Sequence, residues 1–151
     1  MDASKYTKTL LLAVENEVEA YEFYKNAATK TADANLKSIF NELAGEELKH
    51  KVILESFINN NSKPLEFNDV QDYKISESVE LPKLTTSMKY TDGIALAMKK
   101  EEEAMNMYNC FAEASTNNDQ KETFLQLAKM EKGHKVKLEE LYANTAYTEV
   151  W

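Results

Sequence analysis

The chain has 151 residues, of which 43% are hydrophobic and 29% charged, with three glycines and two prolines. This length and composition predict one globular domain, residues 1–151, that needs no disulfide staples. The formal net charge of −8 argues against nucleic acid and anionic membranes as partners, because both are bound through clustered lysine and arginine. No apolar stretch is long enough to span a bilayer, and the lone Cys110 can form no internal disulfide, which favours a cytoplasmic location.

A first helical hairpin is predicted over residues 4–58. Apolar and small side chains recur at intervals of three and four residues along both of its arms, which is the spacing of one helix face. The arms are separated by a break around residues 31–33, where Asp33 is expected to cap the second helix.

Residues 59–90 lose the helical period and contain both prolines. We expect a long connection that lies against the body of the protein, with a short helix near residues 69–76. A second hairpin is predicted over residues 91–145. Thr91 or Asp92 is expected to cap its first helix, a break at residues 117–118 divides its arms, and residues 144–151 are expected to form a tail.

The two hairpins repeat one another. Shifting the chain by 84 residues without gaps superimposes identical residues of the two halves, among them Ala13 and Ala97, Glu17 and Glu101, Tyr24 and Tyr108, Phe40 and Phe124, Glu47 and Glu131, and His50 and His134. Two such hairpins can bury their apolar faces against each other. The sequence therefore predicts an all-α protein, a four-helix bundle made of two repeated hairpins and a long crossover.

Six polar residues interrupt the apolar faces: Glu17, Glu47, His50, Glu101, Glu131 and His134. Within each hairpin the two glutamates are 30 residues apart, with the turn midway between them. At 1.5 Å rise per residue each glutamate lies roughly 22 Å from its turn, so antiparallel packing brings them to one level. Each histidine follows its glutamate by three residues and shares its helix face.

Four carboxylates buried at one level need compensating charge, because an unpaired buried carboxylate costs several kcal/mol. No lysine or arginine shares these faces near that level, so the sequence predicts bound metal. A glutamate from each of two helices and Glu-x-x-His from each of the other two is the ligand pattern of di-iron and di-manganese bundles. We expect two iron ions, with manganese or zinc as the alternatives.

Tyr24 and Tyr108 each follow a candidate ligand by seven residues on the same helix face. Their hydroxyls either pack in the core or hydrogen-bond to a ligand carboxylate. Gly133 lies inside the second Glu-x-x-His motif, where it either allows a close backbone approach or is simply tolerated. Other glutamates fall off the apolar faces and are expected to be exposed, namely Glu15, Glu19, Glu22, Glu102 and Glu103.

Over about residues 4–145 the chain resembles the rubrerythrin-like branch of the ferritin-like superfamily. The resemblance is carried by Glu17 with Tyr24, Glu101 with Tyr108, and the motifs at residues 47–50 and 131–134. It implies that the six residues above ligate two iron ions, that Glu47 and Glu131 bridge them, and that the crossover runs the length of the bundle.

The chain departs from that family pattern in two places. Rubrerythrins proper carry a rubredoxin module with paired Cys-x-x-Cys motifs, which one cysteine cannot build. They usually also have a further carboxylate one turn after the third-helix ligand, where this chain has Ala104. Electrons are therefore expected to come from an external donor such as a rubredoxin-like protein.

The resemblance implies an oxidoreductase that reduces hydrogen peroxide or dioxygen, working as a homodimer. Two alternatives stay open at this point. One is an iron-handling ferroxidase, and the other is a metal-binding bundle without turnover.

Overall fold

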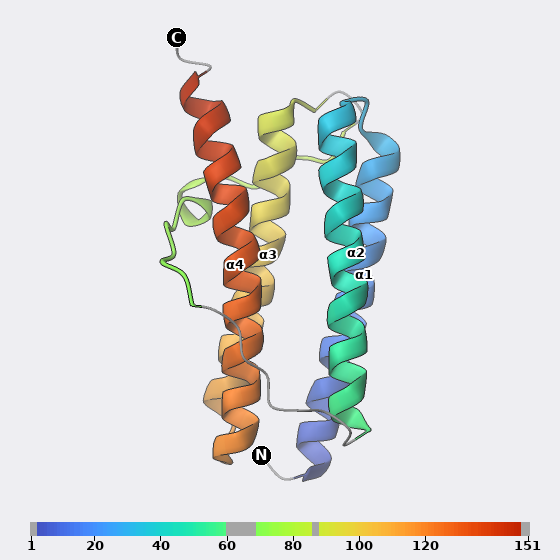
Figure 1. Cartoon of the computed structure of the whole chain (residues 1–151), viewed down its shortest axis with the longest axis vertical. Helices are drawn as coiled ribbons and strands as arrows, with labels where there is room; N and C mark the ends of the chain where they lie inside the picture. Colours follow the sequence, from blue (N-terminus) through green and yellow to red (C-terminus); the bar gives the residue numbers. More distant parts are fainter. Residues whose placement is uncertain (1–2, 60–68, 86–87, 149–151) are drawn as a thin grey trace.

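The computed structural model describes residues 3–59, 69–85 and 88–148, and within these ranges its regular structure is helical throughout. Four long helices form a bundle (Figure 1): α1 (Ala3–Lys30), α2 (Ala34–Ile58), α3 (Tyr90–Ala114) and α4 (Asn118–Thr148). A single 3₁₀ turn, η1 (Ser76–Ser78), lies in the connection between α2 and α3. The predicted ferritin-like four-helix bundle is confirmed. None of the helices in these ranges is long and apolar enough to cross a membrane.

The helices pair as two antiparallel hairpins, α1 with α2 and α3 with α4 (Figure 1). The described part of the crossover, residues 69–85, begins along the outer side of α4 and then passes behind α4 and α3 (Figure 1). The crossover returns the chain to the end of the bundle where α2 began, so α2 and α3 run in the same direction. This arrangement places α1 beside α3 on one face and α2 beside α4 on the other.

One of the two helix caps predicted from the sequence is present in the structure. The side chain of Asp33 caps α2, because its Oδ1 accepts a hydrogen bond from the Leu36 amide at 2.9 Å. The expected cap of α3 at Thr91 or Asp92 is wrong, since Lys89 occupies that position and makes no side-chain cap bond. Asp92 instead lies in the first turn of α3, where its negative charge interacts favourably with the helix dipole.

Two further expectations about secondary structure are wrong. The short helix predicted near residues 69–76 is absent apart from the η1 turn. Lys74 has φ of 54°, a left-handed conformation that does not continue a right-handed helix. The C-terminal tail predicted from Asn144 is helical as far as Thr148, because no residue there breaks the helix.

The buried apolar residues form two clusters that lie on opposite sides of one polar level. The first contains Tyr24, Leu36, Phe40, Ile94 and Met98, together with smaller neighbours. The second is built on Leu10, Leu54, Tyr108, Phe124 and Leu127. The glutamates predicted as ligands lie between the two clusters along every helix, so the apolar core is divided by charged side chains.

Polar contacts hold the crossover on α4. Lys135 is fully buried, and its Nζ lies 2.6 Å from Asp72, 2.8 Å from Glu77 and 3.1 Å from Glu139. The Ser76 amide donates to the same Glu139 carboxylate at 2.8 Å. These three carboxylates raise the pKa of Lys135, overcoming the burial that opposes its charge. The lysine therefore stays charged, and it joins the connection to the bundle.

Gly93 lies where α3 crosses the start of α2. A Cβ atom at this position would stand 2.2 Å from Cδ2 of Leu36 and 2.8 Å from its Cγ. The clashing atoms belong to the end of the Leu36 side chain, which is fully buried in the first apolar cluster and would have to repack among its neighbours. Glycine at position 93 therefore permits this close approach of the two helices.

We predict that Gly93→Ala destabilises the metal-free protein by about 1–3 kcal/mol, the usual cost of overpacking a core. The clash with Leu36 outweighs the gain of about 1 kcal/mol in helix propensity that alanine brings. Urea unfolding followed by the helical circular dichroism signal measures the change.

Gly45→Ala is the matched control. Gly45 is also helical but exposed, and no heavy atom lies within 4 Å of its added Cβ. This variant should be more stable than the parent by about 0.5–1 kcal/mol. If the two variants shift stability in the same direction, the close approach at Gly93 does not constrain the bundle.

Candidate metal centre

Six polar side chains from all four helices meet at the level that divides the apolar core. They are Glu17 on α1, Glu47 and His50 on α2, Glu101 on α3, and Glu131 and His134 on α4. Five of them are at most 3% exposed, whereas the His134 side chain is 17% exposed. The structure thus brings together every residue that the sequence predicted as a metal ligand.

The six side chains form two overlapping groups of four. One group contains Glu17, Glu47, His50 and Glu131, and the other contains Glu47, Glu101, Glu131 and His134. Within each group, one candidate ligand atom per residue lies within 4.8 Å of all the others. Glu47 and Glu131 belong to both groups. Each of them could therefore contribute an oxygen to either group.

Contacts of the imidazole rings define the centre of each group. Nδ1 of His50 lies 3.4 Å from Glu17, 3.5 Å from Glu47 and 3.3 Å from Glu131. Nδ1 of His134 lies 3.8 Å from Oε2 of Glu101. The two rings stack with centroids 5.1 Å apart and planes 16° from parallel. Each ring thus presents a nitrogen to a separate set of carboxylate oxygens.

Without metal, the two shared carboxyl groups hold protons. Burial, together with the negative charge of Glu101, raises the pKa of Glu47 to about 12. Burial and the charge of Glu101 likewise raise the pKa of Glu131 well above its usual value. Both groups are therefore neutral near pH 7.

The other carboxylates and one histidine are ionised in the same state. Burial opposes the charge of Glu17, but its interactions with Glu47 and His50 prevail and lower its pKa. The pKa of Glu101 falls to about 2, because its interactions with Glu131 and His134 also outweigh burial. Burial opposes the charge of His50 as well, but Glu17 and Glu47 raise its pKa to about 10. Protons thus supply part of the charge compensation in the metal-free centre.

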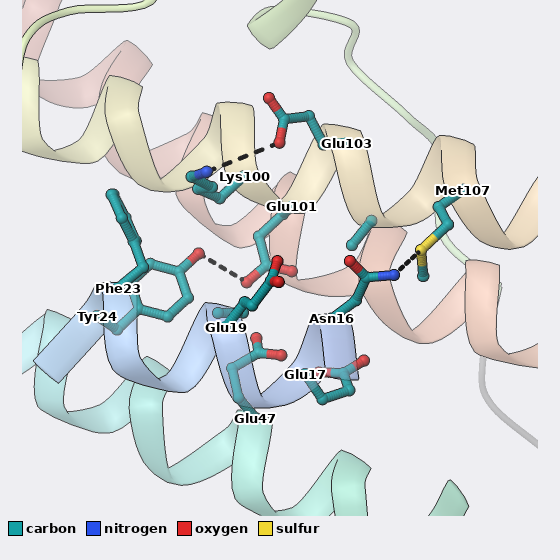
Figure 2. Close-up of a pocket in the computed structure, with 12 residues that line it drawn as sticks. Asn16, Glu17, Glu19, Phe23, Tyr24, Glu47, Lys100, Glu101, Glu103 and Met107 are labelled. Atoms are coloured by element: carbon teal, nitrogen blue, oxygen red, sulfur yellow. Dashed lines mark hydrogen bonds and ion pairs between the residues drawn. The ribbon is translucent and has the colours of Figure 1, made fainter. Parts of the chain in front are cut away.

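Two tyrosines hold the unshared carboxylates from the opposite hairpin. The Tyr108 hydroxyl on α3 donates to Oε1 of Glu17 on α1 at 2.7 Å. The Tyr24 hydroxyl on α1 donates to Oε1 of Glu101 on α3 at 3.1 Å (Figure 2). In both glutamates the second oxygen, Oε2, is buried and makes no hydrogen bond. Each tyrosine therefore fixes one oxygen and leaves the other available to a ligand.

Several buried polar atoms of the centre have no hydrogen-bond partner in the part of the chain that the structure describes, and they indicate whether a metal ion would fit there. Among the described residues, six buried atoms of the two groups lack a hydrogen-bond partner: Glu17 Oε2, His50 Nδ1, Glu101 Oε2, both oxygens of Glu131, and His134 Nδ1. Buried polar atoms are rarely left unpaired, because each costs about 1–3 kcal/mol. Oxygen and imidazole ligands converging on two positions suit a pair of divalent transition-metal ions.

One pocket reaches the centre between α1 and α3 (Figure 2). It encloses about 200 Å³ and ends on the carboxylates of Glu17, Glu47 and Glu101. Its walls include two small side chains, Ala20 and Ala104, which occupy equivalent positions in the two hairpins. Small molecules can therefore approach the carboxylates from this face.

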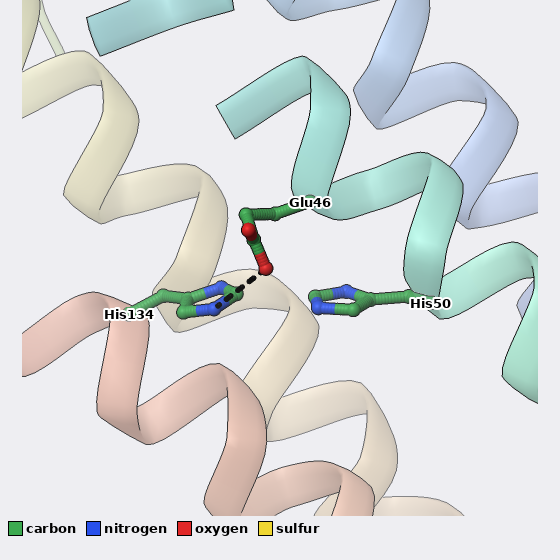
Figure 3. Close-up of side chains that lie close together, drawn as sticks. All are labelled: Glu46, His50 and His134. Atoms are coloured by element: carbon green, nitrogen blue, oxygen red, sulfur yellow. Dashed lines mark ion pairs between the residues drawn. The ribbon is translucent and has the colours of Figure 1, made fainter. Parts of the chain in front are cut away.

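A second pocket, of about 250 Å³, opens between α2 and α4, where His50 and His134 form part of its lining. Glu46 lies beside both rings (Figure 3), with its Oε2 4.0 Å from Nε2 of His134. Glu46 was not among the predicted site residues, although its position four residues before His50 puts both side chains on one helix face.

The residues around the centre also correct two expectations. Glu102 was expected to be exposed, but its side chain is 17% exposed and pairs with Lys99 at 3.6 Å. The other four off-face glutamates, Glu15, Glu19, Glu22 and Glu103, are exposed as predicted. No heavy atom lies within 4 Å of a Cβ built on Gly133, so this glycine does not serve a close helix approach.

Comparisons with known proteins show which family and which fold this chain resembles. The family model described as Rubrerythrin matches residues 8–144. A solved structure of a hypothetical protein from Pyrococcus furiosus is 29% identical, with a TM-score of 0.59, and the match covers 91% of this chain and 88% of that one. Among curated proteins, the search finds no significant match. The family match covers nearly the whole bundle and all six converging side chains, and the chain belongs to the rubrerythrin family.

Proposed function

We propose that the protein is a di-iron oxidoreductase that reduces hydrogen peroxide or dioxygen with electrons from an external donor. The observation that carries this proposal is the pair of overlapping groups that share Glu47 and Glu131. The first group would hold one ion through Glu17 and His50, and the second would hold the other through Glu101 and His134. When bound, two ferrous ions would supply the two electrons that reduce a peroxide O–O bond.

The protein residues prepare the site for this chemistry. Tyr24 and Tyr108 orient the unshared carboxylates, so that Oε2 of each is left without a hydrogen bond and could bind an ion. The two apolar clusters keep the centre dry on both sides along the bundle axis, which strengthens its electrostatic interactions. Glu47 and Glu131 bind protons in the metal-free state and release them when they become ligands.

The α1/α3 pocket supports a small oxidant as substrate. Ala20 and Ala104 leave space beside Glu17, Glu47 and Glu101. Because the pocket has a volume of about 200 Å³, it has room for peroxide or dioxygen. The lone Cys110 provides no thiol pair for electron transfer within the chain, so the proposal includes a separate electron donor, such as a rubredoxin-like protein.

We predict that the purified protein binds about two metal ions per chain, and that Glu131→Gln removes them. Glu131 belongs to both groups, so the loss of its charge weakens both positions at once. Inductively coupled plasma mass spectrometry after growth with iron measures the content. Glu113→Gln, an exposed glutamate on α3, is the control and should retain both ions.

Metal binding is also predicted to release about three protons per chain at pH 7, because ligands bind in their deprotonated forms. Glu47, Glu131 and His50 have raised pKa values and are protonated before the metal arrives. Protons therefore compete with metal, and affinity should rise with pH. Calorimetric titrations in two buffers of different ionisation enthalpy count the protons, and binding without release would contradict this account.

The reaction itself is tested by loading the protein with ferrous iron without oxygen and then adding hydrogen peroxide. Oxidation should be rapid and visible as near-ultraviolet absorbance of ferric iron. Ala104→Leu should slow it by about tenfold, because the larger side chain fills the α1/α3 pocket without removing a ligand.

Gly133→Ala serves as control, since it changes the α2/α4 pocket and meets no neighbouring atom. It should react at the parental rate. Iron-loaded protein that is inert to both peroxide and dioxygen would rule out the proposed function. Equal rates in the parent and Ala104→Leu would instead show that the oxidant does not use the α1/α3 pocket.

A further inference from the structure

A third group of possible ligands lies on the solvent side of the centre. Glu46, His50 and His134 each offer one atom within 4.8 Å of the others, in the α2/α4 pocket (Figure 3). We propose that these three side chains form an outer site, where a divalent transition-metal ion binds first before it passes to the inner centre. The inference rests on the proposed function only in requiring that the inner centre binds metal.

His134 links the outer and inner positions through its two nitrogens. Its Nδ1 faces Glu101 at 3.8 Å, while its Nε2 faces Glu46 at 4.0 Å. His50 also belongs to both the outer group and an inner group. An ion held by Glu46 is therefore already next to two side chains of the inner centre, and a short displacement across the rings exchanges one set of ligands for the other.

Exposure falls from the outer site to the inner one. The Glu46 side chain is 35% exposed and that of His134 is 17% exposed, whereas Glu131 is fully buried. A hydrated cation that moved directly to a buried site would lose its water before gaining ligands, which is costly. At a partly exposed site, one carboxylate and two imidazoles can replace the water molecules around the cation one at a time. Imidazole ligands also favour transition metals over magnesium or calcium.

Glu46 has an oxygen available for this role. Its Oε1 lies 3.1 Å from Nζ of Lys49, whose side chain is 72% exposed, so this ion pair is weak and easily displaced. Its Oε2 faces His134. The position equivalent to Glu46 in the second hairpin is occupied by Met130. At these two equivalent positions, only α2 therefore has a carboxylate.

The α1/α3 pocket is the competing route. Glu19 and Glu103 add negative charge to the lining of this pocket, and this charge attracts cations of any kind. However, Glu103 is 65% exposed and pairs with Lys100 at 3.8 Å, and no histidine lines this pocket. Among the described residues, no group of possible metal ligands includes Glu19 or Glu103. This pocket attracts cations without offering the ligands that would replace their water.

The test is the rate at which the metal-free protein takes up Co²⁺, followed by stopped-flow absorbance, with final stoichiometry measured by mass spectrometry. Glu46→Gln should slow uptake by at least about tenfold, the scale on which loss of a supporting carboxylate weakens metal sites. The final content should stay at about two ions per chain, because every inner ligand is retained. Lys49→Gln should speed uptake at least about twofold, since it frees the Glu46 carboxylate.

Two charge-matched controls separate the routes. Glu42→Gln removes an exposed carboxylate one turn from Glu46 on α2, and Glu103→Gln removes one from the α1/α3 pocket. Both should take up Co²⁺ at the parental rate. An unchanged rate in Glu46→Gln, or slow uptake in Glu103→Gln instead, overturns the outer site while leaving the inner centre intact. Failure of the parent protein to bind Co²⁺ would count against the proposed function as well.

Discussion

The structure depends on the burial of four carboxylates at one level of a helical bundle. Hydration of these groups is lost on folding, so each must be neutralised by a proton, an imidazolium or a metal ion. The raised pKa values of Glu47 and Glu131 and the lowered value of Glu101 show how the metal-free protein meets this demand. The apolar clusters on either side provide the burial energy that offsets the cost. Folding and metal binding are therefore coupled through the same atoms.

Hydrogen bonds across the bundle extend this coupling to the packing of the hairpins. Tyr24 and Tyr108 each reach from one hairpin to a carboxylate of the other, so a change at Glu17 or Glu101 acts on both. On the outside of α4, Lys135 fixes the crossover through carboxylates that are distant in sequence. The centre is thus held by contacts across the hairpin interface, while the connection is fixed separately at the periphery.

The bundle and its six converging residues were predictable because they follow helical periodicity and an internal repeat. Glu17 and Glu47 reach the same level by geometry alone, once the turn between them is located. Other features depend on partners that carry no periodic signal. Lys135 lies four residues after Glu131, but its ion-pair partners Asp72 and Glu77 lie in the aperiodic crossover, so the spacing of residues does not reveal these contacts. Glu46 shares a helix face with His50, but its position beside His134 follows only from the packing of α2 on α4.

The internal repeat relates Glu47 to Glu131 and His50 to His134 in the sequence. Glu46 breaks this repeat, because its counterpart is Met130. A carboxylate on one side and a thioether on the other place different electric fields on two otherwise matched halves. The two groups of candidate ligands therefore lie in different electrostatic surroundings, although the hairpins that carry them repeat one another. The duplicated bundle is in this way asymmetric in charge around its candidate metal centre.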